Sequence, residues 1–161
     1  MSGYIIEEIL ETHDGVIWVQ TNYGLSKVDK DKRLVVDYPQ FKGSYMMVKN
    51  ELGDLFFFSS SNSLYAFNEK KQEFYKIPIR NLNREEIVNL YVNEHFLVLF
   101  LKNEIVYYQI DRSPDGEYKL SSINTCEKTQ VNYGFGDKDQ IYWLDGDYNL
   151  FGYSLDKPVK K

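Results

Sequence analysis

One stretch of sequence decides the fold: residues 14–29 read DGVIWVQTNYGLSKVD. An Asp-Gly pair leads into the apolar run Val16–Val19, and the polar triplet Asn22–Gly24 separates that run from a second one, Leu25–Val28. Short apolar runs bounded by turn residues are typical of strands, and Gly supplies the positive φ that tight hairpin turns require. The stretch therefore predicts a β-hairpin.

The same pattern occurs three more times along the chain. The second apolar run of each copy begins at one of four anchors, Leu25, Leu64, Ile105 and Leu150. The anchors are 39, 41 and 45 residues apart. The positions seven residues before them hold Trp18, Phe57, Val98 and Trp143. We therefore expect the four copies to share one register.

Further β-like runs precede every copy and follow the first three, which makes four strands per repeat. Four short strands with a period of about 40–50 residues match one blade of a β-propeller. Ankyrin, tetratricopeptide and armadillo repeats need a helical periodicity that is absent from this sequence. The sequence predicts an all-β fold, a partial β-propeller of about four four-stranded antiparallel blades.

We expect a single domain over residues 1–161, with blades at approximately 4–39, 44–79, 87–124 and 131–161. The last blade is expected to be incomplete, because the sequence reaches Lys161 where an outermost strand should begin. Four blades are the lower limit for closed propellers. We therefore expect self-association, or completion by the remaining blades of a longer parent chain.

Charge and composition argue against several classes of partner. The formal net charge is −5 and the 19 Lys and Arg residues are dispersed, so nucleic acid is not an expected partner. No apolar run reaches 18 residues, so no membrane segment is expected. Cys126 is the single cysteine, and His13 and His95 have no second ligand nearby in sequence, so no cofactor or metal is expected.

The first copy resembles the two-component regulator propeller repeat. Residues 6–9 and 14–29 match that family's pattern of an Asp-Gly turn, an aliphatic-Trp-aliphatic strand, a Thr, a Gly-Leu pair and a closing Asp. The main departure is Gln20, where the family usually has Gly. The other copies are more degenerate, since Phe57 and Val98 replace the Trp and no later copy keeps Gly before Leu.

The resemblance implies a function. Such repeats form the periplasmic sensor region of Bacteroides-type hybrid two-component proteins, whose histidine kinase lies elsewhere in the parent. It therefore implies a periplasmic, non-catalytic segment that senses a carbohydrate-type ligand and passes on a signal. Two alternatives stay open: a scaffold or protein-interaction propeller that mediates self-association, and, as the weakest, a propeller glycosidase or lyase.

A ligand is expected at the turns between the second and third strands of each blade, and at the links between blades. The candidate ligand-binding residues are Asn22, Tyr23, Asn62, Asn103, Asp147, Tyr148 and Arg80, with Ser61, Lys102, Gln40 and Gln130 beside them. Amides, hydroxyls and Tyr rings suit sugar hydroxyls. The same residue types are also ordinary turn formers, and both interpretations stay open. No catalytic residue is expected.

Two further motifs receive structural interpretations. Trp18 and Trp143 could stack on a sugar ring, but their place within strands predicts packing between blades instead. Residues 145–149, with Asp156, imitate the oxygen spacing of a calcium loop. Leu150 stands where that loop needs Gly, so we predict a hairpin tip.

Overall fold

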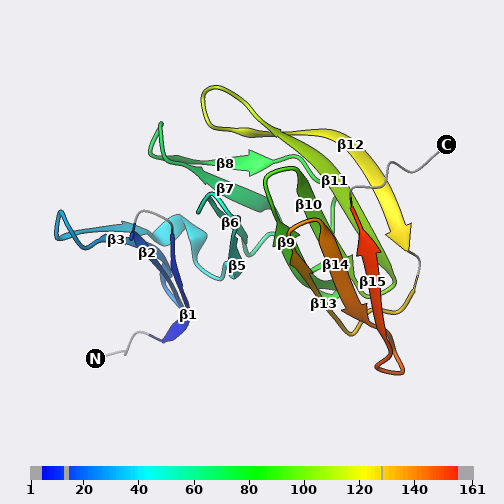
Figure 1. Cartoon of the computed structure of the whole chain (residues 1–161). Coiled ribbons are helices and arrows are strands. Elements are labelled where there is room, and N and C mark those ends of the chain that lie inside the picture. Colours follow the sequence, from blue (N-terminus) through cyan, green and yellow to red (C-terminus); the bar gives the residue numbers. More distant parts are fainter. Residues whose placement is uncertain (1–4, 13–14, 128, 156–161) are drawn as a thin grey trace. The chain divides into compact units, whose positions relative to one another are not determined.

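The computed structural model describes residues 5–12, 15–127 and 129–155. In these residues the chain forms four antiparallel sheets and two short 3-10 turns, and the expected all-β fold is confirmed (Figure 1). Residues 13, 14 and 156 of the motifs above lie outside the described residues, as does the side chain of Cys126.

In each sheet, strands that are consecutive in sequence pair with one another. The first sheet contains β1 (Ile6–Glu11), β2 (Ile17–Thr21), β3 (Gly24–Asp29) and β4 (Leu34–Tyr38). The second contains β5 (Tyr45–Lys49), β6 (Leu55–Phe58), β7 (Leu64–Asn68) and β8 (Glu73–Ile77). The third contains β9 (Ile87–Val92), β10 (Phe96–Leu101), β11 (Glu104–Arg112) and β12 (Tyr118–Glu127). The fourth contains β13 (Tyr133–Asp137), β14 (Gln140–Leu144) and β15 (Leu150–Ser154).

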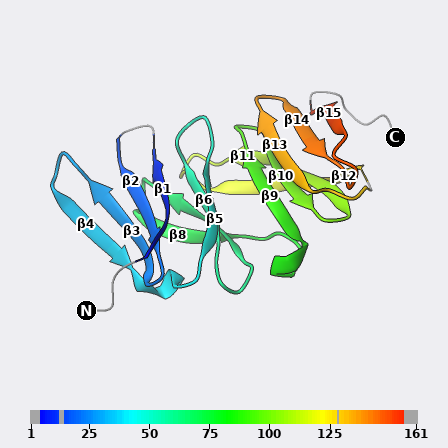
Figure 2. The same cartoon turned by 90° about the horizontal axis from the view of Figure 1, so that it is seen from below.

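Each sheet is thus a meander of the blade type, with three strands among the described residues of the fourth. Figure 2 shows the strands of the first sheet side by side in chain order. The 3-10 turns are η1 (Pro39–Phe41), in the link after the first sheet, and η2 (Arg84–Glu86), in the link after the second. The second lies in the one stretch of sequence whose residues favour a helix.

The chain divides into two compact units, and each is described by itself. The first unit is Met1–Asn81 with Pro114–Glu117, and the second is Leu82–Ser113 with Tyr118–Lys161. Each unit contains two sheets and its own hydrophobic core. In the first unit, the ammonium group of Lys71 forms ion pairs with the carboxylates of Asp115 and Glu117.

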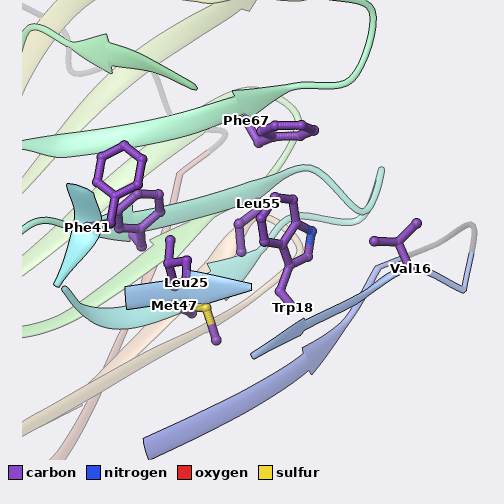
Figure 3. Packing of buried hydrophobic residues seen from close by; sticks show 8 residues of the cluster. Val16, Trp18, Leu25, Phe41, Met47, Leu55 and Phe67 are labelled. Carbon is purple, nitrogen blue, oxygen red and sulfur yellow. The ribbon is translucent and has the colours of Figure 1, made fainter. Parts of the chain in front are cut away.

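The core of the first unit is built around Trp18. Its side chain is fully buried and meets the rings of Phe67 and Phe74, from the second sheet, edge to face at centroid distances of 4.8 and 5.5 Å. Leu25 and Leu55 pack in the same cluster (Figure 3). The predicted packing of Trp18 between sheets is confirmed.

The core of the second unit has Trp143 at its centre. Trp143 and Ile141, from the fourth sheet, are buried against Val98, Phe100 and Ile105 of the third. Trp143 therefore also packs between sheets, as predicted.

Two glycines of β13 permit this packing. A Cβ atom placed on Gly134 would lie 2.1 Å from the Phe100 ring, and one on Gly136 would lie 2.2 Å from the Tyr91 ring. Any side chain at these two positions would therefore separate the two sheets.

The pairing corrects one expectation about the repeat. The four anchors are equivalent, because each pairs with one of the last two paired residues of the strand before it, and paired residues lie on the same side of the sheet. The pairs are Leu25 with Gln20, Leu64 with Phe58, Ile105 with Phe100 and Leu150 with Leu144. We call the side of each sheet that carries its anchor the forward face, and the opposite side the backward face.

The prediction that Phe57 and Trp143 are counterparts of Trp18 is wrong. The strands of the second and fourth sheets are joined by five-residue turns, 59–63 and 145–149, whereas those of the first and third are joined by two-residue turns, 22–23 and 102–103. The longer turns shift the register by one residue, and such a shift moves a side chain to the other face. Trp18 lies on a forward face, and Phe57 and Trp143 lie on backward faces.

We predict that Gly134→Ala destabilises the chain. The new methyl group would overlap the Phe100 ring, and overpacking of this kind costs roughly 1–3 kcal/mol of unfolding free energy. Gly152→Ala, in the same sheet, places its Cβ 3.2 Å from the Tyr142 ring and is expected to change stability by less than about 1 kcal/mol. Urea unfolding followed by circular dichroism measures both, and equal effects would contradict the packing described for Gly134.

Candidate functional site

The turn of the first sheet, residues 22–23, lies next to a cavity. Asn22 is hydrogen-bonded to the segment that leads into β1. Its main-chain N–H donates to the Ile5 carbonyl, and its Oδ1 accepts from the Ile5 N–H. Thr21 shapes the turn, since its hydroxyl donates to the Gly24 carbonyl and accepts from the Tyr23 N–H. Asn22 thus has a structural role, and Tyr23 faces outward.

The cavity beside Tyr23 has a volume of about 440 Å³. It is lined by Thr21, Tyr23, Gly24, Leu25, Ser26, Asp37 and Pro39. The Ser26 hydroxyl donates to Asp37 Oδ1 over 2.6 Å, and the Lys42 ammonium lies 5.9 Å from the centroid of the Tyr23 ring. The cavity therefore presents a hydroxyl pair, one carboxylate and an aromatic ring.

Gly24 is required at this turn for two reasons. Its φ of +137° is rarely adopted by residues with a side chain. A Cβ atom there would also lie 2.6 Å from the carbonyl oxygen of Tyr38. The Gly-Leu pair of the repeat motif thus lets the hairpin approach the link that follows the sheet.

The corresponding turn of the third sheet, residues 102–103, borders a second cavity of about 400 Å³. Main-chain hydrogen bonds of 2.8 Å hold the turn between two links: the Lys102 N–H donates to the Glu86 carbonyl, and the Val131 N–H donates to the Lys102 carbonyl. The cavity is lined by Val88, Lys102, Asn103, Gln130, Val131 and Asn132. The lining residues therefore include three with side-chain amides, one lysine and two valines, of which Val131 is buried in the core.

Gln130 also lies against the turn of the fourth sheet. A Cβ atom on Gly146 would be 2.5 Å from Gln130 Oε1, so the glycine makes room for this amide. Gln130 thus lies between the turn of the third sheet and that of the fourth, in the second unit.

The 145–149 turn is organised by Asp145. Its Oδ1 accepts hydrogen bonds of 2.9 Å from the N–H groups of both Asp147 and Asn149, and the Asn149 amide donates to its Oδ2. The Asn149 N–H and amide, and then the Asp147 N–H, lower the pKa of Asp145. Asp147 and Tyr148 are exposed on the turn, Tyr148 with a φ of +63°.

Asn62 and Arg80 are not among the residues that line either cavity. Asn62 adopts a φ of +59° in its turn, and its Oδ1 accepts a hydrogen bond from the Tyr45 hydroxyl. Arg80 is exposed in the link after β8. Of the candidate residues, the structure therefore places Tyr23 in the first cavity and Asn103 in the second, and gives Asn22 and Asn62 structural contacts.

Several residues that line the cavities were missed from the sequence. Ser26 and Asp37 form a cross-strand pair on β3 and β4, and Asn132 precedes β13. The signal that could have revealed the pair is its polarity within strands that are otherwise rich in aliphatic residues. Among the described residues, no three His, Cys, Asp or Glu side chains are grouped so that they could hold a metal ion.

We predict that Asp145 titrates below its ordinary pKa of 3.8, because the charged carboxylate accepts the hydrogen bonds of the turn. Its contribution to stability is therefore present above the unfolded pKa and is lost as the pH falls through the folded value. An NMR titration of the Asp145 carboxyl carbon measures this pKa. Asn149→Ala should move the midpoint back toward 3.8, and a midpoint at or above 3.8 in the unmodified chain would contradict the role given to Asp145.

The described part of the chain contains no helix long and apolar enough to cross a membrane. No protein-family model matches the sequence, and no curated protein sequence matches it significantly. The comparison with solved structures, in contrast, does find similar proteins.

Three of these structures illustrate the similarity. The extracellular domain of the one-component system BT4673 from B. thetaiotaomicron is 17% identical, and the match covers 96% of this chain and 20% of that one with a TM-score of 0.62. The β-propeller domain of Cps50 (Swd1) from Myceliophteria thermophila is 12% identical over 92% of this chain and 50% of that one, with a TM-score of 0.64. The extracellular domain of the hybrid two-component system BT3049 from B. thetaiotaomicron is 13% identical, and the match covers 94% of this chain and 23% of that one with a TM-score of 0.52.

The chain thus spans between a fifth and a half of the length of these proteins. They include extracellular domains of bacterial one-component and hybrid two-component systems, the class of protein that the first repeat resembles. At these identities the similarity establishes the fold. The four meander sheets are blades, and the chain is a partial β-propeller.

Proposed function

We propose that this chain is a non-catalytic recognition segment of a bacterial β-propeller sensor, located outside the cytoplasm, and that it binds an oligosaccharide at the turn ends of its sheets. The observation that carries the proposal is the second cavity. There the amides of Asn103, Gln130 and Asn132 meet next to Lys102.

The chemistry of this cavity fits a sugar. A side-chain amide both donates and accepts hydrogen bonds, as a hydroxyl group does. Val88, which is half-buried, supplies apolar surface for the C–H face of a ring. A volume of about 400 Å³ falls within the roughly 300–1,000 Å³ of small-molecule sites.

The groups in the two cavities favour binding over hydrolysis. Glycosidases generally use a pair of carboxyl groups on either side of the scissile bond. Among the described residues, no carboxylate lines the second cavity, and Asp37, which accepts a hydrogen bond from Ser26, is the only one that lines the first. The similarity to extracellular domains of one-component and hybrid two-component systems supports a sensor role and a periplasmic or extracellular location.

The proposal is tested by titration calorimetry against a panel of plant and host oligosaccharides. Asn103→Ala and Gln130→Ala should each weaken binding about tenfold, since a lost hydrogen bond of about 1–1.5 kcal/mol corresponds to that factor. Gln109→Ala is the matched control, because it removes an exposed amide on β11 outside both cavities.

Chromatography of the same mixtures should show the oligosaccharide unchanged. Hydrolysis or elimination of the sugar would overturn the non-catalytic role. Failure of every sugar in the panel to bind, or an equal loss in the Gln109→Ala variant, would overturn the assignment of the second cavity.

A further inference from the structure

The fourth sheet presents an apolar forward face to solvent. By register, this face carries Tyr133, Phe135, Tyr142, Leu144 and Leu150. Leu150 is 63% exposed and Tyr133 is 53% exposed, while the rings of Phe135 and Tyr142 stack at 5.2 Å. Large apolar side chains gathered on one face of a sheet are typical of an interaction surface.

The equivalent positions in the other sheets show what this surface is suited to bind. Leu25 and Ile105 are the anchors of the first and third sheets, and each is fully buried. Leu25 lies in a cluster with Leu55 and Phe57 of the second sheet, and Ile105 lies in a cluster with Trp143 of the fourth. In each unit a forward face is therefore covered by a backward face, and Leu150 is the anchor of a forward face that has no such cover.

The same chain contains an uncovered backward face. On the first sheet the apolar residues of this face are Ile9, Ile17, Val19, Val28 and Val35, and Glu11, Ser26 and Asp37 lie on the same side. Ile9 is 60% exposed and Val35 is 59% exposed. It is the counterpart of the backward faces of the second and fourth sheets, which cover Leu25 and Ile105.

We propose that two copies of this chain associate head to tail, with the forward face of the fourth sheet of one copy on the backward face of the first sheet of the other. Aromatic rings from one copy would then pack against β-branched side chains from the other, as Trp143 and Val98 do within the second unit. The interface would also cover Ser26 and Asp37, which line the first cavity, whereas the residues that line the second cavity, on which the proposed function rests, are not among those of either face.

The number of blades agrees with two copies. Four blades from each copy give eight, the upper end of the usual range for propellers. Consistently, 92% of this chain aligns with only 50% of the Cps50 (Swd1) β-propeller domain.

Light scattering on the 161-residue chain tests the proposal, at about 100 μM, well above a typical Kd of about 1 μM for a moderate complex. The expected mass is twice the 19.1 kDa of one chain. Leu150→Asp and Ile9→Asp should each raise the dimer Kd at least a thousandfold, because each places a charge in one of the two buried faces. Arg33→Asp, in an exposed turn at a φ of +50° that Asp tolerates, is the control and should leave the mass unchanged.

Mixing the two variants gives the sharpest result. Each variant retains one intact face, and the two intact faces are complementary, so the mixture should form a dimer that neither variant forms alone. Circular dichroism on each variant establishes that the sheets are folded.

Three outcomes would overturn the proposal. The first is a monomeric unmodified chain at this concentration. The second is loss of the dimer in only one of the two variants, which would mean that like faces pair with each other. The third is a mixture of folded variants that stays monomeric.

Discussion

The interaction on which the structure depends is the packing, within each unit, of an apolar face of one sheet against an apolar face of the next. β6 shows it most clearly, because all four of its residues, Leu55–Phe58, are buried and consecutive side chains of a strand point to opposite faces. A strand whose side chains are buried on both sides cannot belong to a sheet that has one face exposed to solvent. Trp18 in the first unit and Trp143 in the second fill the space between neighbouring sheets, and Gly134 and Gly136 allow the backbone of β13 to approach the rings of the third sheet.

Much of the fold could be predicted from the sequence, because apolar runs and turn residues are local signals. The runs that begin at Leu25, Leu64, Ile105 and Leu150 all became third strands. The facing of individual side chains could not be predicted from spacing alone. In the sequence, a turn of two residues and a turn of five residues both look like a polar interruption. The difference in turn length nevertheless places Trp143 on a backward face and Trp18 on a forward face. The closeness of Gly134 to Phe100 joins residues of two sheets, and only the packed structure reveals it.

The location of the candidate site could be predicted from the sequence, but the identity of its lining residues could be predicted only in part. Propeller geometry places the turns near the links, and the main-chain bonds from Lys102 to Glu86 and from Val131 to Lys102 show this arrangement in the second unit. Which polar residues remain available to a ligand depends on local hydrogen bonds. Asn22 and Asn103 occupy equivalent turns, but the Asn22 side chain holds the chain before β1, whereas Asn103 lines a cavity. Both residues are Asn in a polar turn, so they cannot be distinguished from the sequence alone.

The alternation of short and long turns also bears on how this chain could have grown. The first and third sheets share the two-residue turn, the second and fourth share the five-residue turn, and Leu25 and Ile105 are 80 residues apart. The turn lengths therefore repeat with a period of two sheets, and each compact unit contains one such pair of sheets. Duplication of such a pair would add blades while preserving the order of turn lengths. Gain or loss of a single sheet would instead place two like turns in succession.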